Sequence, residues 1–283
     1  VVNPIKRLSY IANQYRKKNI NEASDYIFPD RGDEIGNLSN NFKIMSNELI
    51  TKINELERFA SDVSHELKNP LASIKSANEI LKNNSDSDTK KKLIDIIEKD
   101  TARINRLITD ISNYTRGAVE LEKQAYKQEI NIVELLYQII ENYGYLNKVK
   151  DKKLNFETNF KKDKIFVISD DEKITQIVRA ILDNAISFSP ENSRILVSCE
   201  KTDSYVLIRI VDQGMGVSSE FSEKIFDRFY KDRNENNYEH SGLGLNIARQ
   251  TAEYYGGSVY LENKKIKGFK GACFVIKLPL KDK

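Results

Sequence analysis

The sequence predicts a multidomain protein of α and α+β type, in which a helical N-terminal part precedes a mixed C-terminal part. Up to about residue 117, apolar residues recur at steps of three and four, which is the period of a helix. From about residue 118, short strand-like runs alternate with helical patterns. The length of 283 residues allows about two domains of the usual size.

The composition narrows the classes of protein that this chain can represent. Hydrophobic residues make up 40% and charged residues 31%, with a mean hydropathy of -0.54, which suits a soluble chain that has a good core. No run reaches the roughly 18 apolar residues that span a bilayer. The 45 basic and 42 acidic residues nearly balance, so we expect no nucleic-acid partner, since such binders concentrate basic charge on one face. Cys199 and Cys273 stand alone without metal-ligand spacing, which indicates buried thiols in a reducing cytosol.

Residues 1 to about 50 predict a helix, a connector and a second helix. The connector, about residues 19–36, holds Pro29, Gly32 and Gly36. The second helix is expected to begin near Asn37 and to continue without a breaker to about Asn83. The first helix is expected to carry its apolar side chains at Ile5, Leu8, Ile11, Ala12 and Tyr15.

The long helix and the helix after it predict a hairpin. The polar residues 83–88 form a turn with capping residues, and the following helix is expected to end near Arg116-Gly117, where glycine suits a helix stop. The apolar positions keep a heptad-like spacing. An isolated hairpin exposes this apolar stripe, and pairing two hairpins into a four-helix bundle buries it, so we expect a homodimer.

The C-terminal part predicts mixed strands with helices on one face, an α/β sandwich. Helical patterns occur at residues 133–148, 171–188, 219–226 and 242–255. Strand-like runs occur at residues 129–132, 154–159, 165–169, 194–200, 205–211, 257–262 and 272–278.

One histidine stands in the middle of the long helical pattern. His65 is followed at once by Glu66, and the amide of Asn69 lies about one helical turn further on. Imidazole titrates near neutrality and is a competent nucleophile when it is deprotonated. For an isolated His-Glu pair, a solvated surface histidine is the stronger interpretation, so the assignment depends on segments further along the chain.

Four such segments follow in a fixed order. Each alone is a weak signal, because a lone Gly-x-Gly is more often a turn and a lone Asn is usually a cap or a surface amide. The segments are Asp183-Asn-Ala-Ile-Ser-Phe-Ser-Pro190, Asp212-Gln-Gly-Met-Gly216, Ile225-Phe-Asp-Arg-Phe-Tyr-Lys231 and Ser241-Gly-Leu-Gly-Leu245.

Together with the upstream His-Glu-x-x-Asn-Pro, these segments resemble the sensor histidine kinases of two-component systems. The resemblance covers essentially the whole chain. The run from Phe59 to Ala77 and the form Asn-Ala-Ile-Ser-Phe-Ser-Pro are similar to alphaproteobacterial envelope-sensing members.

The resemblance implies three domains. Residues 1–50 would form a HAMP signalling module of parallel helices, for which an ordinary amphipathic hairpin is the alternative. Residues 51–117 would form the antiparallel dimerisation and histidine-phosphotransfer hairpin, giving a dimeric four-helix bundle. Residues 118–283 would form a catalytic ATP-binding α/β sandwich of the GHKL type, the fold shared with Hsp90, gyrase B and MutL.

The first residues also suggest where the natural protein lies in the cell. They do not resemble a secretory signal, and the chain begins with a pattern that in this family normally follows a transmembrane helix. We therefore expect the full-length protein to continue upstream into a membrane-spanning segment. The present residues would then be the cytoplasmic portion of an inner-membrane protein.

The segment after the strand at 205–211 is expected to bind the base of ATP. Asp212 ends that strand, and its carboxylate can accept a hydrogen bond from the adenine amino group. Gly214 and Gly216 let the backbone approach the ligand and take positive φ. The alternative is a tight turn between strand and helix.

The helix at 171–188 is expected to bind the metal and the ring. An amide oxygen is a hard ligand suited to Mg²⁺, and the resemblance implies that Asn184 is this ligand and that Phe188 packs against adenine. The family often has Asn at the position of Ala180 and Lys at the position of Ser187. The second departure removes one charge from the phosphate site.

The polar residues 227–241 are expected to form a lid over the nucleotide, with Phe226 and Phe229 as its hydrophobic latches. Lys231, Arg228 or Arg233 would neutralise phosphate, although a solvated loop face is the alternative. After the lid, the N-terminus of the next helix would offer free N–H groups to the phosphates. This phosphate-binding segment consists of Gly242, Leu243 and Gly244. His240 has no evident acid or metal partner, so it is interpreted as a bystander.

The implied reaction moves the γ-phosphoryl group of ATP to His65, with Glu66 holding or accepting the imidazole proton. A surface carboxylate that interacts with Lys68 or solvent is the alternative for Glu66. The phosphoryl group would pass onward to an aspartate in a response-regulator receiver domain. Asn69 would orient a water that hydrolyses the regulator's acyl phosphate, and a helix-kink amide before Pro70 is its alternative.

Two other functions remain open from the sequence. A GHKL-type ATPase that drives a conformational cycle would explain the nucleotide segments but leaves His65 without a role. A catalytically weak signalling scaffold would be compatible with the departures at Ala180 and Ser187.

Overall fold

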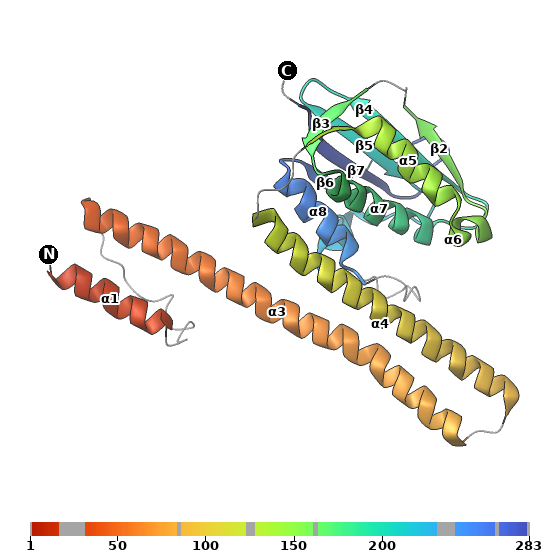
Figure 1. The fold of residues 1–283 in the computed structure, drawn as a ribbon, viewed down its shortest axis with the longest axis horizontal. Coiled ribbons are helices and arrows are strands. Elements are labelled where there is room, and N and C mark those ends of the chain that lie inside the picture. The colour runs from red at the N-terminus through yellow and green to blue at the C-terminus, as the bar shows by residue number, and fades with distance from the viewer. Residues whose placement is uncertain are drawn as a thin grey trace. The chain divides into compact units, whose positions relative to one another are not determined.

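A computed structural model describes residues 2–16, 32–83, 86–122, 128–160, 164–230, 241–263 and 266–281 (Figure 1). The chain divides into two compact units, Val1–Lys68 and Asn69–Lys283. The finer division into residues 1–50, 51–117 and 118–283 stays a prediction. None of the described helices combines the length and the apolar character needed to cross a membrane.

The first unit contains helix α1 (Val2–Arg16) and the N-terminal part of helix α3 (Glu34–Asn83). The expected start of the long helix near Asn37 is wrong, because Asp33 caps the helix earlier. The Asp33 carboxylate accepts a hydrogen bond from the Gly36 N–H at 3.1 Å, and the Asp33 carbonyl accepts one from the Asn37 N–H at 3.0 Å. Gly36 therefore lies inside the helix rather than in the connector. The connector residues 17–31 lie outside the described residues, and the HAMP assignment stays a prediction.

The second unit begins with the rest of α3 and with helix α4 (Ser87–Glu122). The expected capping turn is present, since Asp86 accepts hydrogen bonds from the backbone N–H and the hydroxyl of Thr89 at 3.0 and 2.6 Å. The expected stop at Arg116-Gly117 is wrong, because α4 runs through Gly117 to Glu122. A glycine costs a helix about 1 kcal/mol relative to alanine, but it ends the helix only where it adopts a left-handed conformation.

The predicted α/β sandwich follows, and each of the seven strand-like runs forms a strand. A five-stranded sheet has the order β2-β4-β5-β7-β6, with β2 parallel to β4 and the other pairs antiparallel. Strands β1 and β3 form a separate antiparallel pair. The strands are β1 (Gln128–Asn131), β2 (Asn155–Asn159), β3 (Phe166–Ser169), β4 (Arg194–Lys201), β5 (Tyr205–Val211), β6 (Ser258–Leu261) and β7 (Cys273–Pro279).

The helices of this region differ from prediction in two places. The pattern at 133–148 forms two helices, α5 (Ile132–Gly144) and α6 (Asn147–Asp151), because the first ends at Gly144. The pattern at 219–226 forms two short 3₁₀ turns, Ser219–Phe221 and Lys224–Phe226. Helices α7 (Asp171–Phe188) and α8 (Gly244–Tyr254) agree with prediction.

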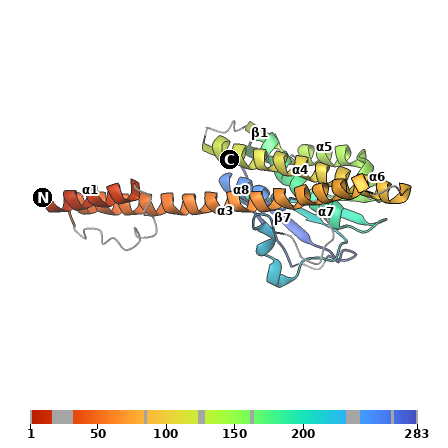
Figure 2. The same ribbon diagram turned by 90° about the horizontal axis from the view of Figure 1, so that it is seen from below.

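The core lies between one face of the five-stranded sheet and helices α5, α7 and α8 (Figure 2). Alternate residues of each strand point into it, as Ile195, Val197 and Cys199 of β4 do. Helix α7 contributes Ile177 and Ile181, which are fully buried. This core fixes α7 and α8 against the sheet, and the residues expected to bind nucleotide lie at the ends of these elements.

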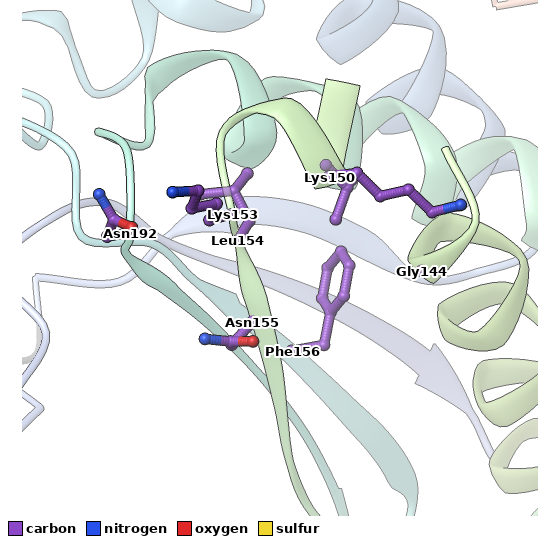
Figure 3. Close-up of a pocket in the computed structure, with 8 residues that line it drawn as sticks. Gly144, Lys150, Lys153, Leu154, Asn155, Phe156 and Asn192 are labelled. Atoms are coloured by element: carbon purple, nitrogen blue, oxygen red, sulfur yellow. The ribbon is translucent and has the colours of Figure 1, made fainter. Parts of the chain in front are cut away.

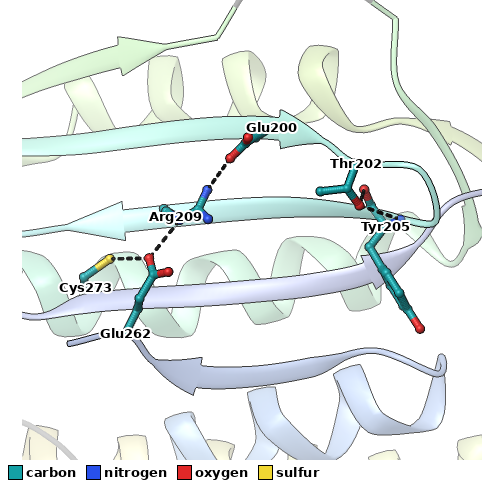
Figure 4. Close-up of polar contacts among 6 residues, drawn as sticks. All are labelled: Glu200, Thr202, Tyr205, Arg209, Glu262 and Cys273. Carbon is teal, nitrogen blue, oxygen red and sulfur yellow. Dashed lines mark hydrogen bonds and ion pairs between the residues drawn. The ribbon is translucent and has the colours of Figure 1, made fainter. Parts of the chain in front are cut away.

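The opposite face of the sheet is crossed by an ion-pair network (Figure 4). The guanidinium of Arg209 on β5 donates to Glu200 on β4 at 2.8 Å and to Glu262 beyond β6 at 2.9 Å. Burial acts to lower the pKa of Arg209, and the hydrogen bonds to both carboxylates raise it, with a net rise. Cys273 contacts Glu262 through sulfur at 3.8 Å. Both cysteines are buried thiols outside any disulfide, as predicted, and burial raises the pKa of Cys199 to about 12.

Candidate nucleotide site

Asp212 is a buried carboxylate at the end of β5, only 2% exposed. Its Oδ1 accepts hydrogen bonds from the backbone N–H groups of Gly214 at 2.7 Å and Ala272 at 3.1 Å. Burial raises the pKa of this carboxyl, and the two backbone hydrogen bonds act against the rise. Among the described residues, no hydrogen bond reaches Oδ2. One oxygen therefore anchors the side chain, and the other remains available to accept a hydrogen bond from a ligand.

Two glycines make room around this carboxylate. A Cβ added to Gly271 would lie 1.8 Å from Asp212 Oδ1, and a Cβ added to Gly214 would lie 2.6 Å from the Phe188 carbonyl oxygen. Gly214 is thus required for space, not for positive φ as the sequence suggested. Gly216 does adopt φ of +76°, in agreement with that expectation. The turn after β5 is closely packed on both sides, and even a methyl group would displace it.

Helix α7 brings Asn184 and Phe188 to the same end of the domain. Its N-terminus is capped by Asp170, whose carboxylate accepts from the N–H groups of Glu172 and Lys173. Asn184 is half-buried, and its amide makes no hydrogen bond to any described residue. Phe188 is also half-buried, and its carbonyl faces the Gly214 turn.

The neighbouring Asp183 is anchored from α5. The hydroxyl of Tyr143 donates to Asp183 Oδ1 at 2.7 Å, and Tyr143 is 5% exposed. Burial raises the pKa of Tyr143, and the negative charge of Asp183 raises it further. This bond ties the turn of α7 that carries Asn184 to the core helix beside it.

The two ends of the predicted lid meet at its base. The Phe229 N–H donates to the Gly242 carbonyl at 2.9 Å. Phe229 has φ of +58° and Gly242 has φ of +77°, and a Cβ on Gly242 would lie 2.7 Å from the Phe229 Cα. Only glycine fits at position 242. Lys231, Arg233 and His240 lie outside the described residues.

The N-terminus of α8 follows the lid directly. Leu243 precedes the helix, is fully buried and provides no side-chain hydrogen bond to the first turn. The first N–H groups of a helix have no partner within it, and the helix dipole is positive there, which suits an anion. Gly244 faces Ala180, since a Cβ on Gly244 would lie 3.8 Å from the Ala180 Cβ. The departure at Ala180 is therefore located beside this helix end.

Helix α4 contacts the same end of the domain. The guanidinium of Arg228 lies 5.2 Å from the ring centre of Tyr114. Asp110 accepts a hydrogen bond from the hydroxyl of Ser241, next to Gly242. Burial, the largest effect, raises the pKa of Asp110, and the negative charge of Asp183 raises it further. The hydrogen bond from Ser241 and the positive charge of Arg106 lower this pKa, but the net change is a rise. Arg228 therefore faces an aromatic ring of α4 in this arrangement.

His65, Glu66 and Asn69 lie on consecutive turns of α3. His65 and Asn69 are exposed and Glu66 is half-buried. His65 and Glu66 belong to the first compact unit, whereas Asn69 and the nucleotide-site residues belong to the second. The helix continues without interruption from the histidine through Pro70.

The described residues fit a nucleotide. The Oδ2 of Asp212 is available to the amino group of a base. The first N–H groups of α8, which receive no side-chain cap from Leu243, suit phosphates. No group of three or more His, Cys, Asp or Glu suited to a metal occurs in the described part of the chain. Mg²⁺ keeps several waters and binds phosphate oxygens, so the one amide oxygen of Asn184 is compatible with it.

Four residues of this region were missed from the sequence. Gly271 and Ala272 lie about 60 positions after Asp212, and only the β5–β7 pairing brings them beside it. Tyr143 and Asp110 come from helices far away in the chain. No local motif in the sequence marks any of them.

Comparisons with known proteins agree with this geometry. Residues 55–118 match the family described as His Kinase A (phospho-acceptor) domain. Residues 169–282 match the family described as Histidine kinase-, DNA gyrase B-, and HSP90-like ATPase, which implies ATP binding in this region.

Two curated relatives extend the similarity to almost the whole chain. Sensor protein ChvG of Rhizobium meliloti (strain 1021) is 38% identical over 289 residues, covering 99% of this chain and 50% of the relative. Sensor histidine kinase YclK of Bacillus subtilis (strain 168) is 30% identical over 287 residues, covering 98% of this chain and 59% of the relative. The chain thus spans about half the length of the curated relatives it matches.

Solved structures show the same architecture. Histidine kinase ThkA in complex with response regulator protein TrrA matches with a TM-score of 0.64 and 25% identity, over 82% of this chain and 64% of that chain. Acinetobacter baumannii histidine kinase AdeS matches with a TM-score of 0.56 and 18% identity, over 77% of this chain and 98% of that chain, which shows the fold alone. The two domain matches and the ChvG relatives show that the chain belongs to the sensor histidine kinases of two-component systems and resembles their alphaproteobacterial members.

Proposed function

We propose that this chain is the kinase portion of a sensor that transfers the γ-phosphoryl group of ATP to His65 and then to an aspartate of a response-regulator receiver domain. One observation carries the proposal. A single chain combines an exposed histidine in a phosphoacceptor domain with a nucleotide cradle whose Asp212 keeps one carboxylate oxygen free. An ATPase that uses hydrolysis only to drive a conformational cycle does not require that histidine.

The residues divide the work by chemistry. Asp212 accepts from the adenine amino group, and Phe188 packs on the ring. The N–H of Gly244 and the following N–H groups of the first turn of α8 hold the phosphates. The segment of Gly242 and Leu243 leads into that turn, and the Leu243 N–H donates to Ser241 Oγ at 3.1 Å. Gly242 lets the lid close over the phosphates. Lys231 neutralises phosphate charge from the lid. Asn184 would hold Mg²⁺, which when bound would supply positive charge against the phosphate oxygens.

Transfer needs a neutral imidazole and a place for its proton. A ring nitrogen of His65 attacks the γ-phosphorus, the bond from phosphorus to the bridging oxygen breaks, and ADP leaves with the electron pair. Glu66 hydrogen-bonds the other ring nitrogen and accepts the proton that the ring loses. Phosphohistidine is a high-energy phosphoramidate, so transfer onward to an aspartate is downhill.

The exposed apolar side chains of α3 and α4, such as Leu71 at 62% and Ile108 at 52%, support a homodimer. The ThkA–TrrA likeness supports a receiver domain as the partner. The ChvG relatives, which are about twice as long as this chain, support a natural protein that extends beyond it. Its placement on the cytoplasmic side of an inner membrane stays a prediction.

The test is incubation with γ-labelled ATP, using wild type, His65→Gln and His240→Gln, which is matched because the chain has only 2 histidines. We expect acid-labile, base-stable label on wild type and His240→Gln and none on His65→Gln. When receiver domains from a panel are added, the cognate receiver domain should take the label from His65. ATP hydrolysis without label on the protein would indicate an ATPase. Nucleotide binding without hydrolysis and without label would indicate a scaffold.

Asn69 is expected to serve the reverse reaction, regulator dephosphorylation. Asn69→Ala should leave autophosphorylation within about twofold of wild type and slow dephosphorylation of the regulator by at least about tenfold, since it loses the amide that orients a water. The decay of labelled regulator measures this. An equal loss of both activities would show that Asn69 only shapes the helix before Pro70.

A further inference from the structure

One ammonium group holds the C-terminal end of α7. The Lys152 Nζ donates to the carbonyl oxygens of Ile186, Ser187 and Ser189 at 3.0, 2.8 and 2.9 Å. Lys152 itself lies between α6 and β2, more than thirty residues earlier in the chain. Two carbonyl groups of the last turn of α7 and the carbonyl group of its C-cap residue Ser189 thus converge on one distant side chain.

The location suits a cation. The last carbonyl groups of a helix have no partner within it, and the helix dipole is negative there. An ammonium group has three N–H donors, which matches three acceptors. The backbone adds two further links between the same segments, from Asn192 N–H to the Lys152 carbonyl at 2.8 Å and from Asn155 N–H to the Ser193 carbonyl at 3.1 Å. Lys152 is therefore built into the structure, half-buried rather than solvated.

The held segment is part of the nucleotide site. Asn184 lies within the last turns of α7, and Phe188 is its last residue. The Phe188 carbonyl lies against Gly214, so the end of α7 is enclosed between Lys152 and the turn that follows Asp212. A shift of this segment would move the metal-binding amide, the ring under adenine and the base-binding turn together.

We propose that Lys152 is a positioning residue for nucleotide binding: it fixes the C-terminal turn of α7 so that Asn184 and Phe188 meet ATP. This inference rests on the proposed ATP-binding function. Lys152 does not replace the phosphate charge that is absent at Ser187, because its N–H donors point at backbone carbonyl groups of α7.

Two neighbouring lysines provide matched controls. Lys150 and Lys153 line a cavity of about 450 Å³ on the outside of the domain, together with Phe156 and Asn192 (Figure 3). Both are exposed, and Lys150 lies 5.9 Å from the ring centre of Tyr145. Each carries the same charge as Lys152 within two residues of it.

The experiment compares wild type with Lys152→Met, Lys152→Arg and Lys153→Met in the full chain. Autophosphorylation is measured against ATP concentration, and hydrogen exchange of the α7 amides is measured without nucleotide. Lys152→Met should raise KM for ATP about tenfold or more, with kcat within about threefold, because uniform binding is lost. The arginine variant should recover most of the affinity, since a guanidinium also donates to carbonyl groups. Lys153→Met should match wild type.

Faster exchange at the end of α7 together with the rise in KM supports the inference. An unchanged KM in a folded Lys152→Met, or an equal rise in Lys153→Met, overturns it. If the methionine variant does not fold, Lys152→Gln is judged by the same ratio of KM values. If wild type neither binds nor uses ATP, the proposed function fails. Hydrogen exchange then decides separately whether Lys152 holds α7. Unchanged protection of the α7 amides in Lys152→Met would show that it does not.

Discussion

The helices α3 and α4 and the α/β region differ in where their apolar side chains lie. In the α/β region, Ile181 and Ile195 are 0% exposed and belong to one continuous core. In the helices, Leu56, Leu71 and Ile108 are 66%, 62% and 52% exposed. The α/β region completes its core within one chain, whereas the helices present an apolar surface that needs a partner. The region expected to bind ATP is therefore expected to be stable alone, and the region that carries His65 depends on assembly.

The largest expected effect is on the α/β core. Ile181→Ala removes a fully buried side chain from α7 and leaves a cavity, so we expect the free energy of unfolding of this region to fall by about 2–5 kcal/mol. Urea unfolding followed by hydrogen exchange of α7 measures the loss. Ile108→Ala is the matched control, and it should cost the α/β region almost nothing. Equal losses would mean that the two regions are not independent.

The next effect separates binding from folding. Gly271→Ala places a methyl group on Asp212 Oδ1, so the carboxylate must move from its position. We expect the affinity for ATP to fall about a hundredfold, which corresponds to about 2.7 kcal/mol. Calorimetric titration with a non-hydrolysable ATP analogue provides the measurement. Gly144→Ala, at a glycine with nothing within 4 Å of an added Cβ, should bind as wild type does.

The helical surface should respond to charge without any change in the nucleotide site. Ile108→Glu puts a carboxylate on the exposed apolar stripe, and we expect the dissociation constant of the homodimer to rise at least about tenfold because that charge would be buried on pairing. Sedimentation equilibrium measures this. Asn113→Glu, an exposed polar position on a different side of α4, controls for the added charge. A dimer unaffected by Ile108→Glu would place the interface elsewhere.

The smallest effect concerns pH where α4 meets the α/β region. While α4 is packed against the α/β region, the pKa of Asp110 is raised above its ordinary value of 3.8. Asp110 therefore binds its proton more tightly when α4 is packed than when α4 is separated from the α/β region. The contact is then strongest below the ordinary pKa and weakens as pH rises through the raised pKa. Ser241→Ala should raise this pKa further, and Asp183→Asn should lower it. Carboxyl NMR titration follows both; shifts in the opposite direction would contradict the arrangement.

The sequence alone was sufficient for the order of elements and for the family. The short strand-like runs after about residue 118 predicted all seven described strands, because strand-forming residues are concentrated within each run. The ordered motifs led to Asp212, Asn184 and Gly242 as predicted site residues, because each lies within a short stretch of chain. Helix ends were less certain: Gly117 and Asp33 show that a stop or a cap depends on backbone conformation and side-chain geometry.

Tertiary structure decided the contacts that join distant segments. The approach of Gly271 to Asp212 follows from the pairing of β5 with β7, and the hold of Lys152 on α7 follows from the path of the chain around the end of that helix. Neither residue belongs to a local pattern, because a close approach or a hydrogen bond to a backbone carbonyl places no requirement on the neighbours in sequence. The sequence determined which reactive and ligand-binding residues the chain contains. The packing of the sheet and helices determined which other residues position them.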